Sequence, residues 1–209
     1  MTSLTYKPEE TGLLIVDPYN DFMSQGGKLF SVIETIASEV GLIANLRTLM
    51  VTLRDAGAKI FFVPHHRWEP GDYIHWKFAN NTQMASGKRQ TFAKGTWGGE
   101  FHDDFKPLPG DIVIKEHWAQ SGFANTDLDH QLKQYGIQKI IVVGLMANTC
   151  IESTARFGME LGYHVTLVKD GTAAASKDAM YAAHEVNGPT FAHAITTTRE
   201  LLESFIKPG

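Results

Sequence analysis

Three side chains that could carry out nucleophilic catalysis follow three separate apolar runs. Asp17 ends the run GLLIVD, Lys115 ends DIVIKE, and Cys150, the single cysteine of the chain, follows KIIVVG. An acid, a cation and a thiol suffice to deprotonate the thiol, stabilise the thiolate and attack a carbonyl carbon. Each residue alone also has a plain structural interpretation: a turn aspartate before proline, a solvated lysine, and a buried inert cysteine. Together they form a candidate catalytic site.

The residues around Cys150 favour the catalytic interpretation. Thr149-Cys150-Ile151-Glu152 has the spacing of a capping box, with Thr149 at the N-cap and Glu152 at the third helical position. Cys150 would then lie in the first turn of a helix, where free N–H groups and the helix dipole favour an anion. With Lys115 beside it, the thiol is predicted to be a thiolate at neutral pH.

The elements that must position these residues alternate along the chain. Apolar runs rich in β-branched residues predict six strands, at 12–17, 58–64, 111–116, 139–144, 163–170 and 191–196. Amphipathic segments predict helices at 32–55, 127–135, 149–161, 177–187 and 197–206. This alternation predicts an α/β fold, a three-layer α/β/α sandwich around a doubly wound six-stranded parallel sheet in Rossmann-like order. Ligands of such sheets bind at the carboxyl ends of the strands, where the three candidates lie.

Composition sets the broad class. The 209 residues, 43% of them hydrophobic, predict one domain over 1–209. Residues 65–110 form an aromatic insertion without a clear long helix, and we expect this insertion to cover the site or to form a subunit contact. A net charge of −4 argues against nucleic acid as the partner. The single cysteine suits a reducing cytoplasm, and no apolar run reaches the roughly 18 residues of a membrane span.

Three motifs carry a family resemblance. LLIVDPYNDF, DIVIKEHWAQSGFANTDLD and VVGLMANTCIESTARFGMELGY together resemble the isochorismatase-like cysteine hydrolases, which include nicotinamidases and N-carbamoylsarcosine, biuret and ureidoacrylate amidohydrolases. The resemblance implies that the family's Asp-Lys-Cys triad falls on Asp17, Lys115 and Cys150. It also implies a cis peptide at Leu145–Met146 and an oxyanion hole made by the backbone N–H groups of Met146 and Cys150.

The implied activity is hydrolysis of an amide or carbamoyl C–N bond, other than a peptide bond, through a cysteine thioester. Asp17 would accept the thiol proton and later protonate the leaving amine, and Lys115 would stabilise the thiolate. GTWGGE and SGFANTDLD most resemble the ureidoacrylate and biuret type. Two alternatives stay open: an isochorismatase-type ether hydrolase, and a catalytically silent binding protein. A nucleotide-dependent oxidoreductase is disfavoured because no glycine-rich fingerprint follows the first strand.

His117 offers a competing catalytic group. It lies two residues beyond Lys115, and alternation along an extended segment would put both side chains on the same side. Cys–His pairing activates thiols in many enzymes. The resemblance nevertheless favours Asp17 as the base.

The substrate and its pocket are less defined. Candidate wall residues are aromatic or imidazole side chains near the motifs: Phe22, His66, Trp76, Trp97, His117, Trp118 and Phe123. His65, His66, Asp72 and His75 are possible metal ligands, but their spacing matches no zinc motif, so we expect neither a metal nor a cofactor. The resemblance implies a small-molecule substrate and a homo-oligomer, either dimer or tetramer. The segment 177–209 receives no assigned chemistry.

Overall fold

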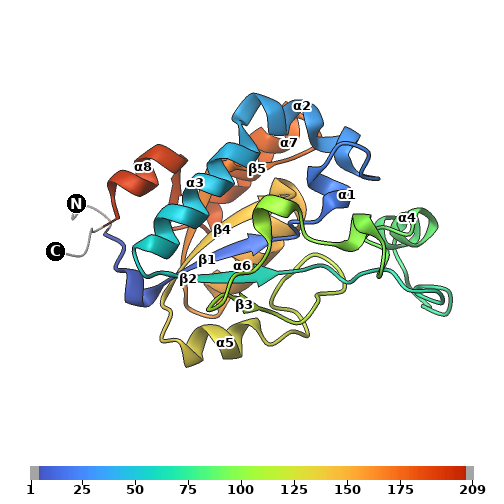
Figure 1. The fold of residues 1–209 in the computed structure, drawn as a ribbon, viewed down its shortest axis with the longest axis horizontal. Coiled ribbons are helices and arrows are strands. Elements are labelled where there is room, and N and C mark those ends of the chain that lie inside the picture. The colour runs from blue at the N-terminus through green and yellow to red at the C-terminus, as the bar shows by residue number, and fades with distance from the viewer. Residues whose placement is uncertain (1–4, 206–209) are drawn as a thin grey trace.

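A six-stranded parallel sheet forms the centre of the computed structural model, which describes residues 5–205 (Figure 1). The strand order is β3-β2-β1-β4-β5-β6, the Rossmann order, and every pair is parallel. The strands are β1 (Thr11–Val16), β2 (Lys59–Val63), β3 (Ile112–Val113), β4 (Lys139–Leu145), β5 (His164–Ala173) and β6 (Ala194–Thr196). The predicted α/β fold is confirmed.

Helices cover both faces of the sheet. They are α1 (Asn20–Met23), α2 (Phe30–Val40), α3 (Leu42–Asp55), α4 (Asn81–Arg89), α5 (Leu128–Gln134), α6 (Glu152–Glu160), α7 (Lys177–Tyr181) and α8 (Thr198–Glu203). Leu13 and Ile15 of β1 pack in one core layer with α2, α3 and α8, whereas Leu14 and Val16 pack in a second layer with α5 and α6. All six β1 residues are buried, which explains the continuous apolar run.

The predicted helix at 32–55 is two helices. Gly41 separates them with φ of 70° and ψ of 35°, the left-handed conformation that glycine adopts without steric cost. The side-chain amide of Asn45 donates to the carbonyl groups of Val40 and Asp170, which ties the break to β5. No single helix within 5–205 has the length and apolar character of a membrane span, although α2 and α3, bent by 68°, meet that test as a pair.

The 65–110 insertion contains α4, a helix that the sequence analysis did not predict. Its first turn is closed by a capping box, in which Asn80 Oδ1 accepts from the Gln83 N–H and Gln83 Oε1 accepts from the Asn80 N–H. The chain leaving α4 is fastened to α1, because the buried carboxylate of Asp21 accepts the N–H of Phe92 at 2.7 Å and that of Lys28 at 3.1 Å. Figure 1 places α4 beyond the carboxyl ends of the strands, on the side of α1.

Candidate active site

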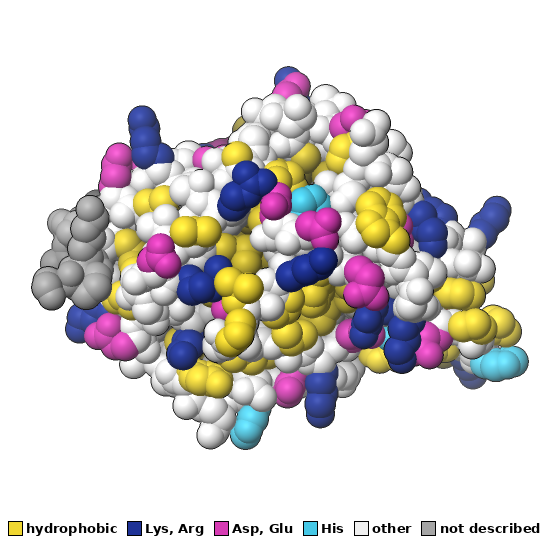
Figure 2. Space-filling view, in the orientation of Figure 1, with side chains coloured by type: hydrophobic (Ala, Val, Ile, Leu, Met, Phe, Trp, Pro, Cys, Tyr) yellow, Lys and Arg dark blue, Asp and Glu magenta, His cyan; other side chains and the backbone are white. Residues whose placement is uncertain are grey.

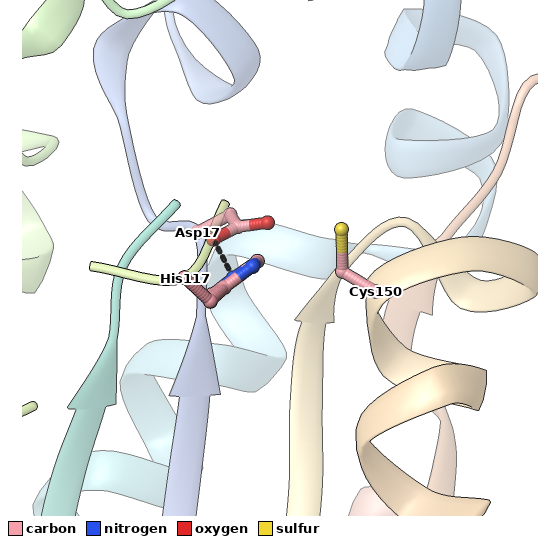
Figure 3. A group of neighbouring side chains, drawn as sticks. All are labelled: Asp17, His117 and Cys150. Atoms are coloured by element: carbon pink, nitrogen blue, oxygen red, sulfur yellow. Dashed lines mark hydrogen bonds and ion pairs between the residues drawn. The ribbon is translucent and has the colours of Figure 1, made fainter. Parts of the chain in front are cut away.

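Asp17, His117 and Cys150 meet at the carboxyl ends of the strands. One oxygen, nitrogen or sulfur atom from each lies within 4.8 Å of those of the other two, and all three side chains are buried (Figure 3). Asp17 follows β1, Cys150 lies in the turn between β4 and α6, and His117 comes from the segment after β3. This is where a doubly wound sheet binds its ligands.

Asp17 is held rigidly in this cluster. Its backbone has φ of 55°, uncommon for a residue with a side chain, and its N–H donates to the carbonyl of Val63. One carboxylate oxygen, Oδ1, lies 3.0 Å from His117 Nε2, and both side chains are fully buried. The other oxygen, Oδ2, has no hydrogen-bond partner among the described residues.

Gly144 brings the ends of β1 and β4 together. Its φ is 111°, and a Cβ at this position would lie 2.2 Å from the carbonyl oxygen of Val16. No other residue type fits there without moving the backbone. The close approach sets the position of Asp17 relative to the turn that carries Cys150.

Cys150 lies in a π-helical turn rather than in a capping box. The turn spans Ala147–Ile151, its N-cap is Met146 with no side-chain cap, and α6 begins at Glu152. The Thr149 hydroxyl faces back to the Met146 carbonyl at 3.5 Å, so it does not cap the helix. The predicted Thr149–Glu152 capping box is therefore wrong, although Cys150 does lie in the first helical turn after β4.

The surroundings of the Cys150 sulfur favour the neutral thiol over the thiolate. Burial raises the pKa of Cys150 well above its usual value, and the charge and hydrogen bonding of Asp17 raise it further. Hydrogen bonds from Thr149 and from the backbone of Met146 act in the opposite direction and are smaller. This direction argues against the predicted resting thiolate. A neutral thiol beside the Asp17 carboxyl group could become a thiolate by proton transfer to that group.

Lys115 does not reach the cluster. Its side chain is exposed and lines a separate surface hollow with Arg67 and Glu116. Its backbone N–H donates to Asp127 Oδ1 at 2.8 Å, whereas the N–H groups of Ile114 and His117 donate to the carbonyl groups of Phe62 and Pro64. Ile114 and His117 are both buried, and this spacing of three breaks the expected alternation between residues 115 and 117. The predicted placement of Lys115 beside Cys150 is corrected: His117 occupies that place.

His117 is fixed by the continuation of the sheet beyond β2 and β3. Its N–H donates to the Pro64 carbonyl at 2.9 Å, and its carbonyl accepts from the His66 N–H at 2.8 Å. The ring of His65 packs edge-on against that of His117, with centroids 5.1 Å apart. The ring of His117 therefore stays against Asp17, and its Nδ1 has no partner within the described chain.

The turn before Cys150 has the predicted backbone geometry. Leu145–Met146 is a cis peptide, as expected from the resemblance. The backbone of Met146 acts to lower the pKa of Cys150. The oxyanion hole formed by the N–H groups of Met146 and Cys150 stays a prediction.

A pocket of about 190 Å³ opens directly above Asp17 and Cys150. It is smaller than the roughly 300 Å³ at the lower end of sites for drug-sized ligands, which indicates a small substrate. Phe22 and Trp118 line it as predicted, and His117 lies beneath it against Asp17. Its remaining lining includes Leu29, Val32, His65, Tyr73, Asn80, Thr82, Gln83, Ser86, Arg89, Thr91, Phe92, Ala119, Gln120, Met146 and Thr149.

Besides His117, four other predicted wall residues lie outside the pocket lining. His66 stacks on Trp118 and pairs with Asp72 at 2.8 Å, so it supports the wall from behind. Trp76 contacts the same indole at a ring-centroid distance of 5.4 Å. Trp97 is 54% exposed on the surface. Phe123 packs between Phe157 and Tyr163 in the core under α6.

Arg89 and Thr91 are pocket residues that the sequence analysis missed. Arg89 ends α4 and is the one Lys or Arg side chain among the described residues that line the pocket. The Thr91 hydroxyl is buried there without a hydrogen-bond partner in residues 5–205. The polar sequence of α4 hides its helical periodicity. The Asn80-x-x-Gln83 capping-box spacing was the available signal.

Groups able to ligate a metal are confined to the same cluster. Within 5–205, Asp17, His117 and Cys150 are the one set of three or more His, Cys, Asp or Glu side chains close enough to share an ion. The histidines of residues 65–75 do not form such a set. His65 Nδ1 lies 2.8 Å from the His66 carbonyl oxygen, and His75 is exposed.

A known protein family matches nearly the whole chain. The model of the isochorismatase domain matches residues 11–199. The ureidoacrylate amidohydrolase RutB of Pantoea ananatis is 31% identical over 200 residues, covering 90% of this chain and 79% of that protein. RutB of Pseudomonas savastanoi pv. phaseolicola is also 31% identical, over 99% of this chain and 88% of its own length.

Solved structures share the fold. A cysteine hydrolase from Pseudomonas syringae pv. phaseolicola superposes with a TM-score of 0.81 at 22% identity, covering 98% of each chain. N-carbamoylsarcosine amidase from Thermoplasma acidophilum has a TM-score of 0.63 at 25% identity, over 90% of this chain and 95% of that one. The domain match over nearly the whole sequence, the relatives and the cluster of acid and thiol lead to one conclusion. The chain belongs to the isochorismatase family, as a hydrolase of non-peptide C–N bonds.

Proposed function

We propose that this hydrolase cleaves the C–N bond of a small ureido or carbamoyl acid through a covalent Cys150 intermediate, with Asp17 as the base and His117 as its partner. The observation that carries the proposal is the buried thiol beside the Asp17 carboxylate, directly beneath a small pocket. The proposal replaces Lys115 by His117 in the triad implied by the resemblance.

The mechanism begins with proton transfer. Asp17 takes the thiol proton, and the Cys150 sulfur attacks the substrate carbonyl carbon. The backbone N–H groups of Met146 and Cys150 hold the developing oxyanion, and a donor of this kind contributes about 2.7–4 kcal/mol in other enzymes. Asp17 returns the proton to the leaving nitrogen as the C–N bond breaks. A water that Asp17 deprotonates then hydrolyses the thioester and restores the thiol.

His117 holds Asp17 in place during these steps. With the proton on Nε2, the imidazole donates to Oδ1 of Asp17, which leaves Oδ2 free to exchange protons with the thiol and the substrate. A single hydrogen bond thus orients the base.

The substrate class follows from the two ends of the pocket. The catalytic end carries Asp17, and the α4 end carries Arg89 and the unpartnered hydroxyl of Thr91. Burial lowers the pKa of His65, which leaves Arg89 as the cation of the pocket at neutral pH. An arginine beside a hydroxyl suits a carboxylate. The ureidoacrylate named for the relatives carries a carboxylate and a ureido group.

We further propose that the enzyme works in the cytoplasm as a homo-oligomer, without nucleic acid or membrane as a partner. Acidic and basic side chains are interspersed over the face shown in Figure 2, so this face offers no field of one sign for nucleic acid. Hydrophobic side chains gather at the end of the molecule where α4 lies, and Phe78 is 85% exposed there. Such a cluster suits a subunit contact.

The test is ammonia release from a panel of ureido acids, N-carbamoyl amino acids and simple amides. We expect release from ureido acids, and with Cys150→Ala a loss of roughly 10³–10⁶-fold in kcat, the range seen when catalytic nucleophiles are removed. Mass spectrometry of the quenched wild-type enzyme should detect a covalent adduct on Cys150.

Two results would contradict the proposal. Hydrolysis that persists in Cys150→Ala would exclude the covalent route. Tight binding of a ureido acid without turnover would indicate a silent binding protein of the same fold.

A further inference from the structure

His117 stands beside Asp17 and Cys150, where the family resemblance implied a lysine, and this difference changes what the site can bind. A lysine ammonium carries three donors and no acceptor, so it repels a cation, whereas a neutral imidazole is among the commonest metal ligands. We propose that Asp17, His117 and Cys150 form a three-ligand Zn²⁺ site, and that the bound ion withdraws the thiol from catalysis. Binding of the ion goes beyond the proposed function. The loss of activity on binding rests on the proposed function.

The ligand types fit zinc. Zn²⁺ is bound by thiolate sulfur, imidazole nitrogen and carboxylate oxygen, at about 2.0–2.3 Å. Tetrahedral coordination at these bond lengths separates the ligand atoms by roughly 3.3–3.8 Å. The three atoms here lie within 4.8 Å of one another, and the His117–Asp17 pair is at 3.0 Å. Binding of one ion therefore requires the sulfur and the other two ligand atoms to move closer together, to about 3.3–3.8 Å.

The cluster also has unused ligand capacity. Asp17 Oδ2 is buried without a hydrogen-bond partner among residues 5–205. A buried polar atom without a partner is costly, and metal coordination supplies one to the carboxylate. The pocket above leaves the fourth position of the ion open to water.

The proton balance is simple and involves no redox step. Zn²⁺ replaces the proton of the Cys150 thiol, which leaves to the buffer as the Zn–S bond forms. His117 binds through Nε2 and carries its proton on Nδ1, and Asp17 binds as the carboxylate. One proton is released for each ion bound, and binding therefore tightens as pH rises.

The experiment uses the full chain after treatment with a chelator, titrated with Co²⁺ as a spectroscopic substitute for Zn²⁺. We expect one Co²⁺ per chain, a sulfur-to-cobalt charge-transfer band, and the intense visible bands of tetrahedral coordination. Zn²⁺ should displace the Co²⁺. Cys150→Ala should remove the charge-transfer band, and His117→Lys should lower the affinity at least tenfold.

A matched control separates this site from surface histidines. His75 is exposed and lies outside the cluster, so His75→Gln should leave the Co²⁺ spectrum and stoichiometry unchanged. Circular dichroism of each variant checks that the fold is retained. A Co²⁺ complex that persists unchanged in Cys150→Ala and His117→Lys would overturn the proposal, and so would the absence of any sulfur-to-cobalt band in the wild type.

The consequence for the thiol is measured without a substrate. At Zn²⁺ about 100 times Kd, roughly 1% of the sites stay free, so alkylation of Cys150 by iodoacetamide should slow about 100-fold. An unchanged alkylation rate would overturn the proposal. Failure of the proposed function is distinguishable, since it would appear as absent turnover in the metal-free enzyme while the Co²⁺ complex still forms. Higher amidase activity with Zn²⁺ than without it would overturn the inhibitory role.

Discussion

His117 Nε2 lies 3.0 Å from Asp17 Oδ1, and neither side chain is exposed to solvent. This pair joins the end of β1 to the segment after β3. The other carboxylate oxygen, Asp17 Oδ2, has no hydrogen-bond partner among the described residues. Asp17, the proposed base, therefore has a fixed orientation before any substrate arrives, and such preorganisation lowers the cost of reaching a transition state.

The first prediction compares two neighbouring residues. His117→Gln removes the imidazole that orients Asp17, and we expect kcat to fall by roughly 10²–10⁴-fold, the range for lost acid–base assistance. Lys115→Gln changes an exposed side chain outside the pocket and should leave kcat within about twofold. Steady-state kinetics on one ureido acid decide the matter. A large loss of kcat in Lys115→Gln, without one in His117→Gln, would show that Lys115 and not His117 is the third member of the triad.

The second prediction concerns the charge at the far end of the pocket. Arg89→Gln should raise KM for a ureido acid by about 10–100-fold, because it removes a charged hydrogen bond worth about 1.5–3 kcal/mol, and should leave kcat nearly unchanged. The matched control is Lys88→Gln, which removes the adjacent exposed charge of α4 that does not line the pocket.

A neutral amide sharpens the test of Arg89. Its KM should be the same in wild type and Arg89→Gln, because it has no carboxylate to bind. Equal losses for acidic and neutral substrates would mean that Arg89 supports the fold of α4 rather than the substrate.

The third prediction concerns the anchor of the pocket wall. Asp21 is 2% exposed, and its carboxylate accepts the N–H groups of Lys28 and Phe92. Asp21→Ala leaves both donors unpaired, so the free energy of unfolding should fall by about 2–4 kcal/mol. Denaturant titration measures it, and amide hydrogen exchange should rise first in residues 89–92. Unchanged exchange there would refute the anchoring role.

The fourth prediction is a pH dependence of stability. Burial would raise the pKa of Glu116, but hydrogen bonds from His66 and Arg67 outweigh it and lower the pKa from 4.5 to about 2. A lowered folded-state pKa gives stability that is present above pH 4.5 and is lost as pH falls toward 2. The contribution is about 1–3 kcal/mol, since one pKa unit corresponds to 1.36 kcal/mol.

Glu116→Gln should therefore lower the free energy of unfolding at pH 7 and flatten its decline between pH 5 and 2. Denaturant titrations across this range measure both effects. The exposed Asp103 offers a control, since Asp103→Asn should change the same curve little. Parallel curves for wild type and Glu116→Gln would contradict the prediction.

The strands, their order and the positions of Asp17 and Cys150 could be predicted because buried parallel strands appear as continuous apolar runs. Lys115 could not be placed in this way. The sequence DIVIKE suggests a strand through residue 116, but β3 pairs with β2 only through Ile112 and Val113. Beyond them, the Lys115 N–H donates to Asp127 and the His117 N–H donates to the Pro64 carbonyl. Alternation along a strand does not predict these hydrogen bonds between residues far apart in the sequence.

The pocket wall was hidden for a different reason. Helix α4 is polar on most of its surface and is held by its capping box and by the Asp21 hydrogen bonds near its end. Neither the capping box nor these hydrogen bonds require apolar residues at helical spacing, so the sequence shows no apolar periodicity there. The break at Gly41 likewise depends on one backbone conformation within an otherwise continuous helical pattern.

The two outer strands of the sheet are its shortest. β3 has two residues and β6 has three, whereas the inner strands have five to ten. The unpaired N–H and C=O groups at a sheet edge form a template on which other chains can add strands. The tapered sheet presents very little of this template on either side, so the long inner strands can be strongly apolar without exposing the protein to edge-to-edge aggregation.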